Sequence, residues 1–231
     1  MRKLELTDVK NLHEYELIRD SWRKDVIAVK TKRRVLLGDM MSLLFESRLT
    51  VLNQVQEMCR VERLAKPEAV QGEIDVYNEL LPDAGELSAT LLVEITEEAR
   101  IQPQLDRLLG LSSGRHVWLE LNGRKMFARF LEGQGREDRI SAVQYVRFPI
   151  GTDPRDREAL AAGPDPVILH VDHPAIGPAR FFLPRPVPRS PAISSTEPLR
   201  SADRIRPCSS ISCATPKPRT FRPPGETRIA G

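Results

Sequence analysis

The sequence predicts an α+β fold, in which about three helices in the N-terminal half accompany a mostly antiparallel β-sheet. Apolar residues recur every three or four positions between Leu12 and Val29, a spacing typical of an amphipathic helix. From residue 115 onward, short apolar runs separated by polar turns follow one another, as in consecutive antiparallel strands. After residue 184 the composition changes, and this change predicts a disordered C-terminal tail.

The first helix is expected from about Asp8 to Lys30, with Thr7 as its N-cap. Several basic residues, Lys30 among them, follow at its C-terminal end, where cations interact favourably with the helix dipole. The apolar stripe of this helix consists of Leu12, Tyr15, Ile18, Trp22, Val26 and Val29. We expect this stripe to pack on the rest of the domain.

A hairpin and a second helix are expected next. Residues 34–37 and 42–46 flank the turn-like sequence GDMM and read as two short strands. The helix begins near Arg48, and its apolar face contains Val51, Leu52, Val55, Met58 and Cys59. We expect this face to pack on a sheet, with Cys59 as a buried small apolar residue and not a nucleophile.

The remaining elements are mostly strands. A short strand is expected at Glu73–Tyr77, a turn at 82–85 and a helix at 97–109 whose first part is restricted by Pro103. Asn122-Gly123 is a strong hairpin signal between two of the later strands. The other expected strands are 87–95, 115–121, 125–131, 142–150, 167–172 and 179–183.

The charge of the chain is unevenly distributed. The net charge is +3, yet residues 185–231 hold nine basic residues against three acidic ones, together with nine of the 19 prolines. Such a segment buries too little apolar surface to offset its ordering entropy. We therefore expect one folded domain at 1–184 and a disordered, Pro/Arg/Ser-rich tail at 185–231. A solvated tail is favoured over a nucleic-acid-binding arm, because aromatic partners for bases are nearly absent. The composition also fits a frameshifted or aberrant terminus.

The sequence indicates a cytoplasmic protein. Its opening residues lack the apolar segment of a signal peptide, and no stretch reaches the roughly 18 apolar residues needed to span a bilayer. The three cysteines are too few and too scattered for a disulfide framework, which fits a reducing compartment.

One polar cluster is a candidate binding or catalytic site. Its members are Glu46, Arg48, Asn53, Gln56, Glu57, Arg60 and Glu86. Asn53, Gln56, Glu57 and Arg60 share one face of the second helix, opposite to its apolar residues. Paired carboxylates perform acid/base chemistry or hold metal ions through oxygen. Solvated helix charges and ion pairs three or four residues apart explain the same pattern without a function.

Metal and cofactor signals are weak. His170, Asp172 and His173 lie close in sequence, but on a strand His173 faces away from the other two. No phosphate-binding loop, G-x-S-x-G elbow or C-x-x-C pair is present, so no cofactor is expected.

Several stretches resemble a bacterial family catalogued as domain of unknown function 3501. They are RRVLLG (33–38), LLFESRLTVLNQVQEM (43–58), RVERL (60–64), VYNELLPDAGELSATLLVEI (76–95), VQYVRFPI (143–150) and VDHP (171–174). The resemblance covers most of residues 1–183 and brings no assigned activity. The resemblance implies that genes of this family lie beside genes for rubrerythrin-like and iron–sulfur oxidoreductases. It therefore implies a role in redox or oxidative-stress metabolism, with such a protein as partner.

Two functions remain open at this point. The first is a noncatalytic accessory or binding protein that contacts a redox partner, with neither a membrane nor nucleic acid as its target. The second is a metal-assisted or hydrolytic enzyme that uses Glu46, Glu57 and Glu86, with Arg48 or Arg60 as an anion clamp.

Overall fold

The computed structural model describes residues 1–112, 115–131, 135–136, 139–162 and 166–183. The chain divides into two units, Met1–Pro188 and Arg189–Gly231. Everything described below belongs to the first unit. The predicted disordered tail lies outside the described residues.

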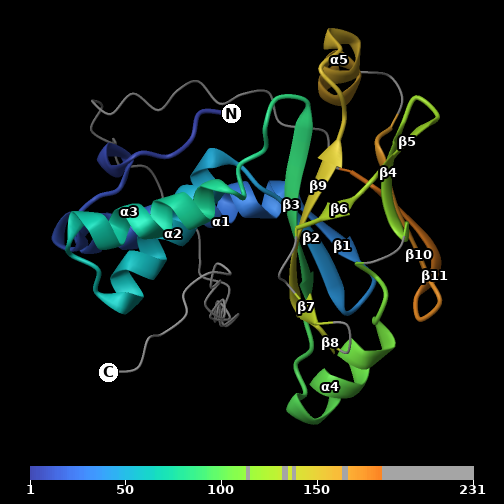
Figure 1. The fold of residues 1–231 in the computed structure, drawn as a ribbon, viewed down its shortest axis with the longest axis horizontal. Helices are drawn as coiled ribbons and strands as arrows, with labels where there is room; N and C mark the ends of the chain where they lie inside the picture. Colours follow the sequence, from blue (N-terminus) through green and yellow to red (C-terminus); the bar gives the residue numbers. More distant parts are fainter. Residues whose placement is uncertain (113–114, 132–134, 137–138, 163–165, 184–231) are drawn as a thin grey trace, which may run out of the picture. The chain divides into compact units, whose positions relative to one another are not determined.

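The fold class is α+β, as the sequence predicts (Figure 1). In the described residues, five α-helices and one 3₁₀ helix accompany two larger antiparallel sheets and a small two-stranded one. The helices are η1 (Leu6–Asp8), α1 (Leu12–Arg33), α2 (Arg48–Glu62), α3 (Pro67–Asn78), α4 (Glu98–Arg107) and α5 (Pro154–Ala162).

The first larger sheet has the strand order β1-β2-β3-β9-β6, and the second has the order β11-β10-β4-β5. The first consists of β1 (Arg34–Leu37), β2 (Met41–Phe45), β3 (Glu86–Val93), β9 (Val143–Pro149) and β6 (Arg129–Phe130). The second consists of β11 (Gly177–Phe182), β10 (Ile168–His173), β4 (Val117–Leu121) and β5 (Arg124–Phe127). The third sheet pairs β7 (Gly135–Arg136) with β8 (Arg139–Ile140). β1 and β11 are therefore edge strands.

The five-stranded sheet is covered on both faces. On one face its side chains share a core with the four-stranded sheet, in which Leu43, Leu119 and Leu169 are fully buried. On the other face, β9 adds Tyr145 to a second core that is mostly helical. In this second core the apolar face of α2 packs mainly on α3. The predicted packing of this face on a sheet therefore describes only part of its contacts, those with Tyr145.

The strand predicted at Glu73–Tyr77 is wrong, because these residues belong to α3. Pro67 occupies the first turn of this helix, where its fixed φ suits a helix start and its missing N–H has no cost. Val70, Ile74 and Tyr77 then lie four and three residues apart on one buried face.

Other elements also differ from the prediction. α1 begins later than expected, because the side chain of Asn11 and not Thr7 caps it by accepting the Glu14 N–H. The single strand expected at 125–131 is divided between β5 and β6, which belong to different sheets. Helix α5 was not predicted.

Candidate functional site

The polar face of α2 contacts other parts of the chain. Trp22 Nε1 in α1 donates a hydrogen bond of 3.0 Å to Asn53 Oδ1. The Gln56 side chain pairs with the backbone of Lys10 in both directions, at 2.9 and 2.8 Å. Asn53 and Gln56 are only 9% and 2% exposed. We call this contact of α2 with α1 and the N-terminal segment the α1–α2 seam.

Glu57 is the most heavily contacted carboxylate in the α1–α2 seam. Arg19 binds both of its oxygens, at 2.8 and 3.0 Å, and Tyr15 donates its hydroxyl at 2.7 Å. Arg60 adds a longer contact of 3.3 Å. Burial alone would raise the pKa of Glu57, but the hydrogen bonds from Arg19 and Tyr15 and the nearby positive charges lower it to about 2. The carboxylate is thus a charged structural anchor.

Arg48 joins the start of α2 to the N-terminal segment. It pairs with Asp8, which Arg2 contacts as well at 2.9 Å. Burial would raise the pKa of Asp8, whereas the hydrogen bond from Arg48 and the positive charges of both arginines hold it below its usual value. Arg48 therefore fixes η1 onto the start of α2.

Glu46 lies elsewhere, buried between β3 and α2. It is 3% exposed and accepts hydrogen bonds of 2.5 Å from the hydroxyls of Thr50 and Thr90. The guanidinium of Arg33 binds the backbone carbonyls of Phe45 and Glu46 nearby. Burial lowers the pKa of Arg33, and the charge of Glu46 opposes this effect. The two hydroxyls and the adjacent cation satisfy the buried carboxylate.

A narrow crevice beside Glu46 is lined by Ser88, Tyr145 and Arg147, among others, and leaves no room for a water molecule. Burial, and then the charge of Glu46, raise the pKa of Tyr145. Within the described part of the chain, Ser88 Oγ and Arg147 Nε are buried without a hydrogen-bond partner. The crevice is too tight, as it stands, for a substrate.

Glu86 belongs to a third network, at the start of β3. It pairs with Arg129 and, at 3.0 Å, with Arg147, which also reaches Asp83 at 2.8 Å. Neither Arg129 nor Arg147 hydrogen-bonds Glu46 or Glu57, although Arg147 lines the crevice beside Glu46. The candidate cluster is thus distributed over three separate networks, and its binding or catalytic role remains a prediction.

The histidine candidates are also held by internal contacts. His170 stacks on Trp118, and its Nε2 lies 2.9 Å from Glu120 Oε2 but makes no hydrogen bond within the described residues. His173 Nε2 lies 3.0 Å from the Leu109 carbonyl oxygen. Among the residues that the structure describes, no three His, Cys, Asp or Glu side chains are grouped to hold a metal ion.

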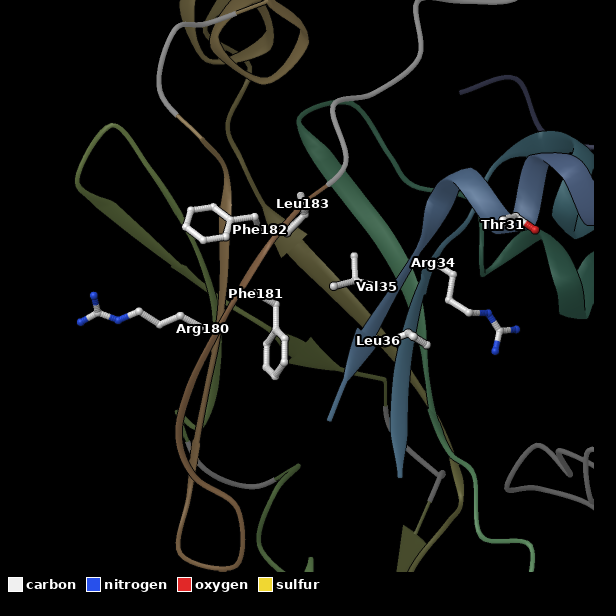
Figure 2. A pocket seen from close by; sticks show the side chains of 8 residues that line it. All are labelled: Thr31, Arg34, Val35, Leu36, Arg180, Phe181, Phe182 and Leu183. Atoms are coloured by element: carbon white, nitrogen blue, oxygen red, sulfur yellow. The ribbon is translucent and has the colours of Figure 1, made fainter. Parts of the chain in front are cut away.

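An open groove of about 520 Å³ lies between β1 and β11. Figure 2 shows Val35 and Phe181 lying between the two strands, whereas Arg34 and Arg180 point away on opposite sides. Leu36 and Phe182 are 66% and 68% exposed. We call this hollow the β1–β11 groove. The sequence analysis did not identify it.

The outer edge of β11 carries free backbone groups. The Leu183 N–H donates a hydrogen bond of 2.9 Å to the Val167 carbonyl oxygen, so along β11 every second N–H, counted from Leu183, points toward β10. The residues in between include Arg180 and Phe182, and their N–H groups therefore point away from β10. Pro178 also lies at one of these outward positions, where its missing N–H costs no hydrogen bond within the sheet, and proline is tolerated at such edge positions.

Comparison with known proteins agrees with this architecture. The model of the family described as "Protein of unknown function (DUF3501)" matches residues 3–188. The chain belongs to this family. The present chain is also similar to a "novel protein of unknown function" from Burkholderia pseudomallei K96243 whose crystal structure is solved. The two sequences are 30% identical, and the structures superpose with a TM-score of 0.71. The match covers 78% of the present chain and 93% of that chain.

The other findings on this DUF3501 member are brief. No curated protein matches it. Among its described helices, none combines the length and apolar character needed to cross a membrane. Cys59 is 1% exposed, and its burial, with the charge of Glu73, raises the pKa of its thiol to about 11, as suits a packing residue.

Proposed function

We propose that this DUF3501 protein is a noncatalytic accessory protein that binds a partner of redox or oxidative-stress metabolism. The observation that carries the proposal is the contrast between its candidate polar side chains and the β1–β11 groove. The candidate catalytic residues are engaged in three internal networks, whereas the β1–β11 groove is open and bordered by exposed apolar side chains.

The class of partner comes from the family resemblance. We propose an iron–sulfur or rubrerythrin-like oxidoreductase, in which case the partner holds the metal and performs the electron transfer. The present chain would then contribute recognition alone, in a reducing compartment such as the cytoplasm. A free cysteine that is buried, Cys59, agrees with this assignment.

The proposal is tested by titrating the purified full chain into purified oxidoreductases of these two types from the same organism. We expect a saturable complex by isothermal titration calorimetry with one of them, with a Kd near the micromolar range typical of small transient interfaces, about 10⁻⁶ M. An unrelated iron–sulfur protein of similar charge serves as control. The absence of heat with every oxidoreductase tested would overturn the redox assignment.

A metal-assisted or hydrolytic enzyme is the second candidate, and the buried Glu46 beside Ser88 and Tyr145 is the feature that favours it. It requires the crevice to open, since the crevice is too narrow for a ligand. Metal analysis of freshly purified protein, repeated on Glu46→Gln, tests this candidate. Stoichiometric metal that this substitution removes would favour the enzyme over the accessory protein.

A further inference from the structure

We infer that the β1–β11 groove binds an extended segment of a partner protein, in which apolar and acidic residues alternate, as an added strand on β11. This inference rests on the proposed binding function and names its surface and its ligand. The free N–H groups of Arg180 and Phe182 supply the backbone donors for such a strand.

The alternation of side chains follows from the geometry of the groove. In a strand paired with β11, one set of side chains would lie beside Phe181 and Val35, which face the interior between the sheets. The other set would lie beside Arg180 and Phe182 on the outer face of the sheet. Apolar residues suit the first set, and acidic residues with an occasional apolar residue suit the second.

Charge selects the occupant. The groove lining contains two arginines and no acidic residue, but Arg34 is paired at 2.6 Å with Glu94, which lies outside the lining. Among the described residues, Arg180 forms no ion pair, so its charge is available to an acidic ligand. A second copy pairing β11 with β11 through a two-fold axis would bring the Arg180 side chains toward each other, which is unfavourable. Residues 185–231 contain nine basic residues against three acidic ones, so their composition does not match an acidic ligand. An acidic segment of a different protein has no such conflict.

The test uses the full chain and a short fluorescent peptide in which valine and glutamate alternate, followed by fluorescence anisotropy. We expect saturable binding that weakens as salt is added, and no binding of the matched valine–lysine peptide. Arg180→Gln removes the charge but keeps the N–H, and should weaken binding about fivefold. Arg180→Pro removes both and should weaken it at least about tenfold. Arg155→Gln, at an exposed arginine of α5, should bind like the wild type.

A second measurement keeps the inference falsifiable if Arg180→Pro does not fold. N-methylation of alternate peptide amides removes the donors on one edge of the probe, and methylation on the paired edge should abolish binding to the wild-type chain. Equal binding of both probe charges, or of both methylated forms, would overturn the inference. So would binding of the synthetic peptide of residues 185–231 as tightly as the valine–glutamate probe, or a dimer in light scattering that Arg180→Pro converts to a monomer.

These outcomes separate the groove from the redox assignment. If an oxidoreductase binds but Arg180→Pro binds it equally well, the proposed function stands and the groove is not its site. If the acidic probe binds the groove but no oxidoreductase binds the chain, the groove inference stands and the redox assignment fails.

Discussion

The α1–α2 seam and the β1–β11 groove place their side chains in opposite ways. In the seam, polar residues such as Gln56 and Asn53 are buried and hydrogen-bonded to distant parts of the chain. In the groove, apolar residues such as Leu36 and Phe182 are exposed on strands that lack a neighbour on one side. Buried, satisfied polar groups specify a fold, whereas exposed apolar groups at an open edge indicate an unfilled interaction. The polar cluster thus has internal partners that account for its burial, and the contrast supports the proposed binding surface at the β1–β11 groove.

Replacing Glu57 should have the largest effect on stability, because Glu57 is the most heavily contacted carboxylate of the α1–α2 seam. Glu57→Ala leaves the Tyr15 hydroxyl and the Arg19 guanidinium without their acceptor in a partly buried site. We expect the free energy of unfolding to fall by about 3 kcal/mol in urea denaturation. Glu62→Ala, on the exposed side of the same helix, is the matched control and should change it by less than about 0.5 kcal/mol. Unchanged stability of Glu57→Ala with lost partner binding would return Glu57 to the functional site.

The pH dependence of stability should reveal the same anchor. The pKa of Glu57 in the folded state is about 2, below the ordinary value of 4.5, so the unfolded state binds the proton first as the pH falls. This contribution is therefore fully present above about pH 4.5 and is lost between there and about pH 2. We expect it to amount to about 2 kcal/mol after allowance for solvent screening. Urea denaturation at several pH values should show a shallower acid slope in Glu57→Gln than in the wild type, and equal slopes would contradict the assignment.

Local signals predicted most of the fold. Helix α2 follows from its spacing and from Ser47, which caps it by accepting the Thr50 N–H. The hairpin of β1 and β2 likewise depends on residues close in sequence. Glu73–Tyr77 was misread because a short window of alternating residues fits a strand and a helix face equally well. Pro67, six residues before Glu73, indicates a helix start, because proline is favoured at the first position of a helix.

The sites were less predictable, because they depend on contacts between distant residues. The partners of Gln56 and Asn53 lie 46 and 31 residues away, so the residues facing α2 cannot be read from its own spacing. Tyr15 and Trp22 gave one usable signal, since aromatic residues with polar tips on a buried stripe require hydrogen-bond partners. For the groove, Pro178 was the signal, because proline within a strand indicates an edge. That β1 lies near this edge depends on the strand order of both sheets.

Gln56 gives a smaller and more local effect. Its side-chain amide accepts a hydrogen bond from the Lys10 N–H and donates one to the Lys10 carbonyl oxygen. Lys10 lies between η1 and α1. Gln56→Leu keeps the volume but leaves the Lys10 N–H and carbonyl without these partners, so we expect a loss of about 1–2 kcal/mol in the free energy of unfolding. Hydrogen exchange should show faster exchange at the Lys10 amide, with the amides of β3 unchanged. If the Lys10 amide exchanges as slowly as in the wild type, then Gln56 does not hold the N-terminal segment in place.

The exposed residues of the groove should have the smallest effect on stability, in contrast with the buried residues of the α1–α2 seam. Leu36 and Phe182 are mostly exposed, so Leu36→Ser and Phe182→Ser remove little buried apolar surface. We expect each to change the free energy of unfolding by no more than about 0.5 kcal/mol. Val35→Ser, one residue from Leu36 but buried in the core, is the control and should cost at least about 2 kcal/mol. A large loss of stability in Phe182→Ser would mean that this side chain already packs against the folded chain. The groove would then be part of the core, and its exposed apolar residues could no longer be taken as the mark of a missing partner.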